Sequence, residues 1–254
     1  METEMMLTVD HVSKSEEDGV ILSDLTFSIP KKGVHGILAP KGAGKTALMK
    51  ILAGWDDRFD GAIFLSDADL TDDFIARKRR IGFLPASPSF DPTMTVSEIM
   101  HFVGCAKGVA SEKRESRIRE ALDLMGLTAL SAKLSRNLSL YERKKLSLAT
   151  ALVGNPKLLL IDEPSLGLGN AEAKEMWELI RMLGGVKTVL LSTDRYEEVE
   201  SLCDDILLMA DGRILAEGSI SELEERLRTT EGQETMTLSE VYRSLCVGRK
   251  EDEQ

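Results

Sequence analysis

The residues best suited to chemistry form a short loop between an apolar run and a stretch with helical periodicity. In a glycine-containing loop that opens a helix, backbone N–H groups and the helix N-terminus can surround phosphate groups. Lys45 would reach the β- and γ-phosphates of a nucleotide, and the hydroxyl of Thr46 would bind Mg²⁺. The spacing therefore predicts a phosphate site rather than a glycine-rich turn before an ordinary helix. The residues expected to contact the nucleotide are Ala39, Pro40, Lys41, Gly42, Ala43, Gly44, Lys45, Thr46 and Ala47.

A second stretch with residues suited to chemistry is an apolar run over 158–161. It is followed by two carboxylates, Asp162 and Glu163. A phosphate-loop site needs an acid to hold the Mg²⁺ shell, and Asp162 has the right place for it. Glu163 comes next and would act as the base, or would orient the attacking water. The phosphate loop upstream favours this interpretation over two carboxylates on an exposed loop.

Short apolar strands alternate with helical stretches, which predicts a largely parallel sheet with ligands at the carboxyl ends of its strands. The alternation is interrupted from Ser87 to about Lys133, where the pattern is helical and Thr95 and Glu98 have capping-box spacing. A small amphipathic helix over residues 238–245 either packs on the domain or mediates a dimer contact. The expected strands of the alternating part are 34–38, 81–84, 158–162, 188–192 and 206–209, and an earlier strand is expected over 20–29.

Composition excludes some classes of function. The chain has 254 residues and a formal net charge of −11, which argues against the broad basic surface that nucleic-acid backbones require. The basic run 77–80 is expected to be a solvated loop before the strand at Ile81. Three cysteines without metal-site spacing predict reduced, buried thiols. An acidic start and the absence of an apolar run of about 18 residues predict a cytoplasmic protein without its own membrane span.

With these two motifs in place, the chain resembles the ATP-binding domains of ABC transporters over nearly its whole length. Residues 93–125 and the C-terminal helix resemble most the subfamily paired with ABC-2 type exporters. The resemblance implies an α/β P-loop NTPase fold with a mainly parallel sheet, flanking helices, an N-terminal antiparallel β subdomain and a helical insertion. It also implies a RecA-like ATP-binding core over 1–86 and 134–218, a helical subdomain over 87–133 and a helical extension over 219–254.

The resemblance further implies that ATP and Mg²⁺ are the cofactors and that a separate membrane-spanning permease is a partner, at the inner face of the cell membrane. In that family two ATP-binding domains dimerise head to tail, and the signature sequence LSGGQ of one covers the ATP of the other. Here the signature position holds Leu138-Ser139-Leu140-Tyr141-Glu142, so both glycines are absent. Ser139 could still donate a hydrogen bond to the nucleotide. It could instead cap its own helix, since Ser139 and Glu142 have capping-box spacing.

Other positions depart from the family pattern on the chain's own side of the site. The family's glutamine after the strand 81–84 is replaced by Ala86, its switch histidine by Asp194, and the aspartate of the loop after Glu163 by Gly169. No aromatic residue precedes Phe27 to stack on adenine. The phosphate loop itself starts with Ala39 instead of glycine, which would cost about 1 kcal/mol if a positive φ were needed there.

These departures bear on turnover more than on binding. Loss of one donor to a developing negative charge typically lowers a rate by about 10²–10³-fold. We therefore expect an exporter ATP-binding subunit with weak intrinsic hydrolysis. The alternative is a catalytically impaired regulatory or structural subunit that pairs with an intact ATPase subunit; homodimer and heterodimer stay open. A soluble protein acting on nucleic acid is disfavoured by the acidic balance.

Overall fold

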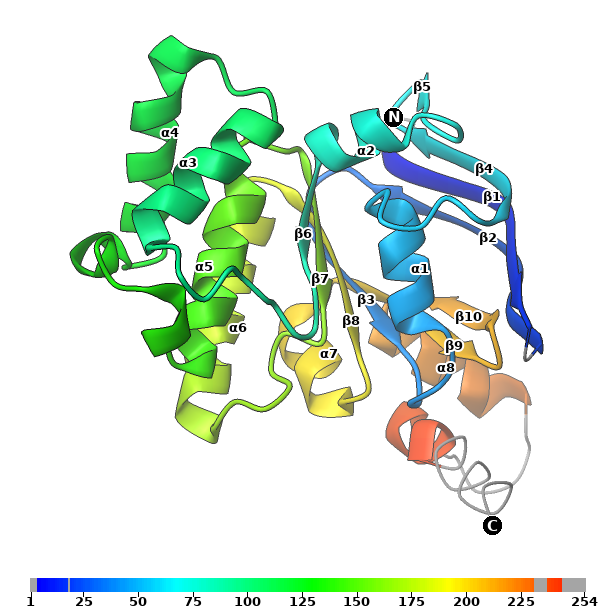
Figure 1. Ribbon diagram of the computed structural model, residues 1–254. Helices are drawn as coiled ribbons and strands as arrows, with labels where there is room; N and C mark the ends of the chain where they lie inside the picture. The colour runs from blue at the N-terminus through cyan, green and yellow to red at the C-terminus, as the bar shows by residue number, and fades with distance from the viewer. Residues whose placement is uncertain (1–3, 18, 231–236, 244–254) are drawn as a thin grey trace.

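The computed structural model describes residues 4–17, 19–230 and 237–243. Its strands form two sheets with helices packed between and around them (Figure 1). The helices are α1 (Lys45–Leu52), α2 (Phe74–Arg80), α3 (Val96–Ala106), α4 (Ser111–Leu124), α5 (Leu140–Leu152), α6 (Asn170–Gly184), α7 (Tyr196–Leu202) and α8 (Ile220–Thr230), with short 3-10 turns η1 (Thr128–Leu130) and η2 (Ser135–Asn137).

The larger sheet carries the candidate site. Its strands are β3 (Gly33–Leu38), β6 (Ile81–Leu84), β7 (Leu158–Asp162), β8 (Thr188–Thr193), β9 (Asp205–Ala210) and β10 (Arg213–Gly218). They lie in the order β10-β9-β3-β8-β7-β6, all parallel except β10, which pairs antiparallel with β9 at one edge. Every residue of β7 and β8 is buried, as expected for parallel strands covered on both faces. The predicted mainly parallel α/β sheet is confirmed.

The smaller sheet is antiparallel and comes largely from the N-terminal part of the chain. Its strands are β1 (Met5–Glu16), β2 (Gly19–Pro30), β4 (Asp60–Leu65) and β5 (Ala68–Asp69), in the order β2-β1-β4-β5. On β2, the buried residues Leu25, Phe27 and Ile29 alternate with the exposed Thr26 and Ser28. This period of two gives the sheet one apolar face. The expected N-terminal antiparallel β subdomain is therefore present.

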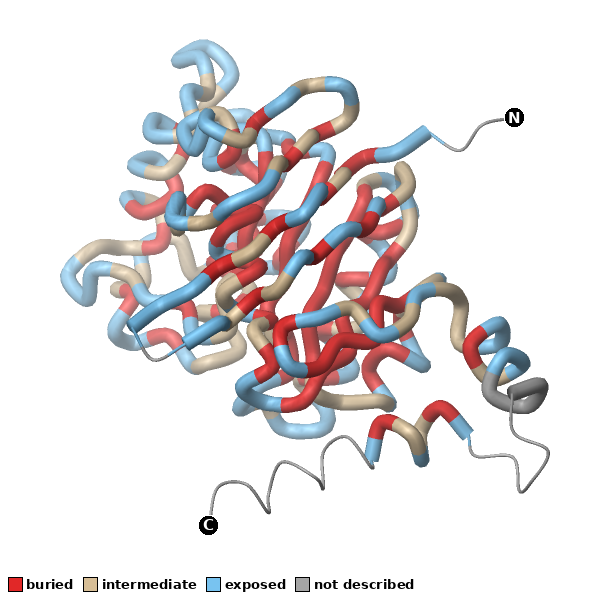
Figure 2. The backbone as a smooth tube through the Cα atoms, turned by 90° about the vertical axis from the view of Figure 1, so that its right-hand side faces the viewer, coloured by how far each residue is buried: buried red, intermediate tan, exposed pale blue. Residues whose placement is uncertain are grey.

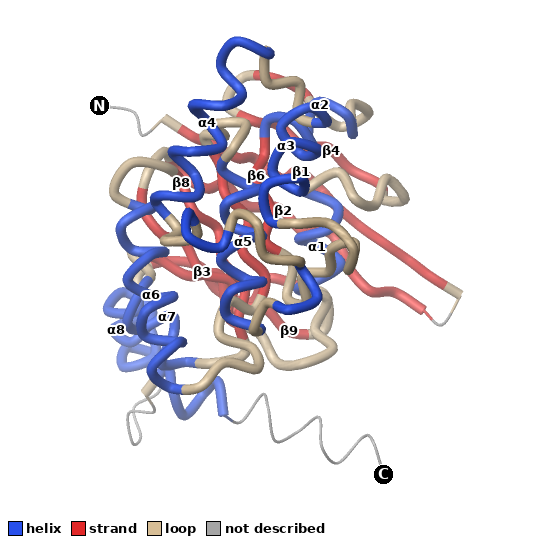
Figure 3. Tube along the Cα trace, turned by 60° about the vertical axis from the view of Figure 1, so that its left-hand side comes forward, coloured by secondary structure: helices blue, strands red, loops and turns tan. Residues whose placement is uncertain are grey.

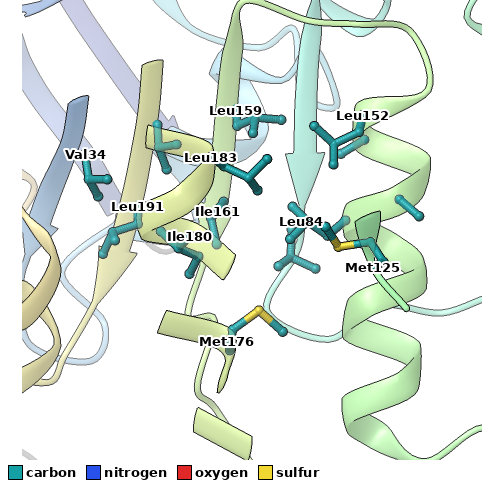
Figure 4. Close-up of a cluster of buried hydrophobic side chains, with 14 of the residues drawn as sticks. Val34, Leu84, Met125, Leu152, Leu159, Ile161, Met176, Ile180, Leu183 and Leu191 are labelled. Carbon is teal, nitrogen blue, oxygen red and sulfur yellow. The ribbon is translucent and has the colours of Figure 1, made fainter. Parts of the chain in front are cut away.

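Two apolar clusters fix the relative positions of these layers. In the first, Leu48 and Ile51 of α1 are buried among residues of both sheets, so α1 lies between them. In the second, residues of the larger sheet such as Leu84 and Ile161 pack with Met176 of α6 and with residues of α3 to α5 (Figure 4). Figure 2 shows the buried residues concentrated in the central strands. The strand ends that would hold a ligand are thus attached to a closely packed core.

The helices α3 and α4 interrupt the strand–helix alternation, as the sequence predicts, and pack against α5. Figure 3 views the molecule from this side, with the strands behind the helices. Thr95 caps α3: its side chain accepts a hydrogen bond from Glu98 N at 3.2 Å, and the Glu98 carboxylate accepts one from Thr95 N at 2.7 Å. The predicted capping box is confirmed. The division of the chain into 1–86 with 134–218, 87–133 and 219–254 stays a prediction.

The prediction of a solvated loop over residues 77–80 is wrong. These residues form the second half of α2, which Asp73 caps by accepting a hydrogen bond from Ala76 N at 2.7 Å. Arg77 is fully buried, and its guanidinium lies 5.2 Å from the centre of the Phe59 ring. The aromatic face attracts the cation, although Nε and Nη1 of Arg77 have no hydrogen-bond partner within the described residues. Within the basic run 77–80, residues 78–80 are exposed and Arg77 is not.

After α8, residues 238–243 form a short helical segment that packs on the domain. Leu238 and Tyr242 of this segment are buried and belong to the same apolar cluster as the residues of Figure 4. The described part of the predicted tail helix therefore packs on the domain, and Leu245 lies outside the described residues.

The cysteines only partly follow the prediction. Cys105 and Cys203 have free thiols, but Cys105 is exposed because it lies on the outer face of α3, so the expectation of burial is wrong for it. Cys203 is half-buried, and Cys246 lies outside the described residues. Within residues 4–17, 19–230 and 237–243, no helix has the length and hydropathy needed to cross a bilayer.

Candidate nucleotide site

The phosphate loop joins the end of β3 to the start of α1. Ala39 N donates to Thr193 O at 3.2 Å, which ties the loop to the end of β8. Ala39 does not have a positive φ, so alanine carries no conformational cost there. Gly42 and Gly44 have φ of 76° and 96°, and a Cβ at Gly44 would lie 2.7 Å from a methyl carbon of Leu22. These glycines permit the turn that leaves the N-terminus of α1 without a side-chain cap.

The side chain of Lys45 folds back over the loop. It is 5% exposed, and its Nζ donates to Ala39 O at 2.7 Å and to Pro40 O at 3.1 Å. The same Nζ lies 3.2 Å from Oε1 of Glu163. Two carbonyls and a carboxylate compensate the buried ammonium. The lysine therefore stands where a phosphate oxygen could replace the carboxylate.

Thr46 and Asp162 are brought together although 116 positions separate them in the sequence. The Thr46 hydroxyl donates to Asp162 Oδ2 at 2.9 Å. The other carboxylate oxygen of Asp162 accepts from Ser192 Oγ, and Asp162 is fully buried. A hydroxyl and a carboxylate side by side are hard oxygen donors of the kind that Mg²⁺ prefers. The residues expected to hold the metal thus fit it.

Glu163 directly follows β7 with a positive φ of 46°. Its N–H donates to Ser192 O at 2.9 Å, and its carbonyl accepts from Lys144 Nζ at 2.8 Å. Burial raises the pKa of its carboxyl; Lys45 lowers it and Asp194 raises it, and the result is a pKa above the ordinary value. A carboxylate with a raised pKa is suited to accept a proton from water.

Sequence reasoning missed Lys144, which is fully buried on α5. Burial lowers its pKa to about 8, although Glu198, Glu163 and Asp162 act in the opposite direction. Its hydrogen bond fixes the backbone beside the two acidic residues of the site. The available signal was a lysine only two positions before the apolar helical stretch 146–152.

A hollow of about 480 Å³ is lined by seven of the predicted residues: Lys41, Gly42, Gly44, Lys45, Thr46, Ala47 and Glu163. Its lining includes the phosphate loop, Glu163, Leu166 and Ile21, with no aromatic residue among them. Ala86 and Asp194, which replace the glutamine and the histidine of the family pattern, also line it. These two substitutions noted in the sequence therefore lie at the site itself.

Ser139 is not part of this hollow. It caps α5 by accepting from Glu142 N at 3.1 Å, while the Glu142 carboxylate accepts from Ser139 N at 2.8 Å and lies 2.9 Å from Lys133 Nζ. The adjacent Tyr141 donates to Glu175 Oε2 at 2.9 Å. The capping role considered for Ser139 is therefore confirmed. Ser139 could contact only a nucleotide bound in the site of a second subunit.

A second hollow, of about 1,020 Å³, lies between α1 and α2 on one side and α3 and α5 on the other. Phe90 and Met94 line it, together with the exposed side chains of Trp55, Ile75 and Phe102. Thr46, Ala86 and Asp162 reach it as well, so it adjoins the nucleotide side. An apolar groove of this size with exposed aromatic side chains is typical of a protein contact.

Comparison with known proteins agrees with this geometry. The family model described as ABC transporter matches residues 22–166. The chain is 33% identical over 218 residues to a daunorubicin resistance ATP-binding protein of Streptomyces coeruleorubidus, covering 85% of this chain and 69% of that one. It is 33% identical over 215 residues to the Nod factor export ATP-binding protein I of Bradyrhizobium diazoefficiens, covering 84% and 70%.

Solved structures have the same fold. The structure of an ATP-binding subunit of an ABC transporter superposes with a TM-score of 0.81 at 24% identity, covering 94% of this chain and 99% of that one. A dimeric ATP-binding cassette in a post-hydrolysis state, bound to ADP and phosphate, gives a TM-score of 0.75 at 22% identity, covering 84% and 98%. The family match over the phosphate loop and acidic strand end, and the similarity to export proteins, lead to one conclusion: this chain belongs to the ABC transporter family as an exporter-type ATP-binding subunit, an ATP hydrolase of the ABC class.

Proposed function

We propose that the chain binds Mg-ATP in the hollow at the phosphate loop and couples it to export by a separate membrane subunit, with slow intrinsic turnover. The observation that carries the proposal is that Lys45, Thr46 and Glu163 line one hollow, while Asp162 accepts a hydrogen bond from Thr46 beside it. The groups that grip phosphate and metal are together, while Ala86 and other replacements stand where the family has groups that assist hydrolysis.

The chain's own residues divide the work as follows. The amides of the phosphate loop and Lys45 Nζ bind phosphate oxygens, which requires Lys45 to exchange the Glu163 carboxylate for phosphate. Thr46 and Asp162 would hold Mg²⁺, which would supply positive charge to neutralise the phosphates. Glu163 accepts the proton of the attacking water, with its backbone held by Lys144.

Slow turnover follows from what is missing around Glu163. Ala86 offers no amide to the water or the metal, and Asp194 offers negative charge where a histidine would donate a hydrogen bond. Each lost donor typically lowers the rate by about 10²–10³-fold, and two such losses need not multiply.

The groove lined by Phe90, Met94, Trp55, Ile75 and Phe102 is the proposed docking site for the membrane subunit. Its apolar lining suits a short helix inserted from the permease. Because it adjoins Thr46 and Asp162, occupancy of the groove can alter the metal site directly. A second ATP-binding subunit, identical or different, is the other proposed partner.

Steady-state phosphate release, measured together with ATP affinity, tests the proposal. Lys45→Ala should lower both, and Glu163→Gln should lower release by at least about 10²-fold while leaving affinity within about threefold. Lys174→Ala, which removes an exposed lysine of α6, is the matched control and should change neither. Added permease should raise turnover. ATP binding with no release that depends on Lys45 or Glu163, with or without permease, would instead favour the regulatory subunit.

A further inference from the structure

Asp194 is a second carboxylate, besides Glu163, in the lining of the hollow. It directly follows β8 and lines the hollow together with Lys45 and Glu163. The charge of Asp194 contributes to the raised pKa of the Glu163 carboxyl, so the two carboxyl groups interact electrostatically. Lys45 already has Glu163 as its ion-pair partner. A nucleotide in the hollow therefore meets a second carboxylate that this lysine does not neutralise.

The backbone around Asp194 is fixed from three directions. The carbonyl of the preceding residue, Thr193, accepts a hydrogen bond from Ala39 N, and the Thr193 hydroxyl donates one to Glu198 Oε2 at 2.6 Å. The carbonyl of Asp194 itself accepts a hydrogen bond from Tyr242 Oη at 2.6 Å, from 48 positions further along the chain. Tyr242 is 4% exposed and anchored in the apolar core, so the hydroxyl is held in place rather than resting on the surface.

We propose that Asp194 determines how well the site distinguishes a nucleoside triphosphate from a diphosphate, and that Tyr242 is the positioning residue that keeps Asp194 in the hollow. The inference rests on the proposed nucleotide binding at this site. A triphosphate adds its extra negative charge at the end of the hollow where Asp194 lies, whereas a diphosphate stops at the phosphate loop and Lys45. Asp194 therefore weakens triphosphate binding selectively, and the C-terminal segment 237–243 controls the extent.

The electrostatic contribution is large enough to measure. Two like charges separated by several ångströms near a protein surface repel by an amount equivalent to about a tenfold change in affinity or more. The Tyr242 hydroxyl acts only through the backbone of Asp194, so its removal should have a smaller effect in the same direction.

The test is calorimetric titration with ADP and with the hydrolysis-resistant analogue AMP-PNP, both with Mg²⁺. Asp194→Asn, which keeps the shape and removes the charge, should strengthen AMP-PNP binding about tenfold and change ADP binding less than about twofold. Asp194→Glu should leave the ratio of the two affinities near that of the wild type. Tyr242→Phe should shift the ratio about two- to fourfold towards AMP-PNP and should have no further effect when combined with Asp194→Asn.

Tyr196→Phe is the matched control, because the Tyr196 hydroxyl makes no hydrogen bond to the described part of the chain and Tyr196 lies only two positions from Asp194. It should leave the ratio unchanged. Equal strengthening of both nucleotides by Asp194→Asn, or an unchanged ratio, would overturn the role of Asp194. A Tyr242→Phe effect that persists in the Asp194→Asn background would overturn the positioning role. Failure of both nucleotides to bind the wild type would contradict the proposed function itself, which keeps the two failures distinct.

Discussion

The N-termini of α1 and α5 are two helix ends with opposite designs. At α1 the cap is Gly44, no side chain satisfies the free amides, and the first turn has no acidic residue. At α5 the cap is Ser139, in a reciprocal capping box with Glu142 that Lys133 extends. Free amides and a positive helix end attract an anion, whereas the Glu142 carboxylate already places a negative charge at the start of α5. The chain is therefore open to phosphate at its own loop and closed at the end it would offer to a partner's nucleotide.

The strongest way to break this contrast is Gly44→Ala. At φ 96°, a Cβ would also lie 2.9 Å from Ile21 O, so the loop must shift. We expect ATP-dependent thermal stabilisation to disappear, corresponding to at least about a hundredfold loss of affinity. Gly185→Ala is the control, since Gly185 has a negative φ and its nearest contact would be 3.4 Å. Wild-type stabilisation by ATP in Gly44→Ala would show that the turn is not what opens this helix end.

A second variant tests the link between the two helix ends. Lys144 lies in the second turn of α5 and donates to the carbonyl of Glu163 beside the phosphate site. Lys144→Met keeps the bulk but leaves that carbonyl without its donor, so unfolding in urea should show a loss of about 1–3 kcal/mol. Phosphate release should fall more than ATP affinity. Lys145→Met, at the neighbouring half-buried lysine, should do neither. A parallel fall of affinity and release would argue against a specific effect on Glu163.

The smallest expected effect concerns the charge of Glu142. Burial raises its pKa, but hydrogen bonds from Lys133 and Ser139 N outweigh this, and the pKa lies below the ordinary 4.5. The unfolded chain therefore binds the proton more readily, and the carboxylate stabilises the fold above pH 4.5 and less as the pH falls through the folded pKa. Glu142→Gln should cost about 0.5–1 kcal/mol at pH 7, measured by urea unfolding. The difference from the wild type should vanish in acid; a constant difference across pH would contradict the electrostatic origin.

Local motifs made much of the site predictable. The phosphate loop and the acidic strand end each lie within a few consecutive residues, so composition and spacing sufficed to place Lys45 and Asp162 in one site. Lys144 and Tyr242 were not assigned roles, because each acts on the site through a contact distant in sequence that no local pattern encodes. The prediction for the basic run failed for a related reason: Arg77 is buried with its guanidinium over the Phe59 ring, and a count of charges does not include that contact.

The ion pair between Lys45 and Glu163 has a consequence for timing. Without ligand, the Lys45 ammonium and the Glu163 carboxylate form an ion pair. Nucleotide binding would therefore require Lys45 to exchange one negatively charged partner for another. In the proposed binding, a phosphate would replace the carboxylate at the Lys45 ammonium, and the same exchange would release Glu163. If Glu163 acts as the proposed base, it would become free to accept a proton only once a phosphate is bound. Lys45 would in this way couple the binding of nucleotide to the release of Glu163 for catalysis.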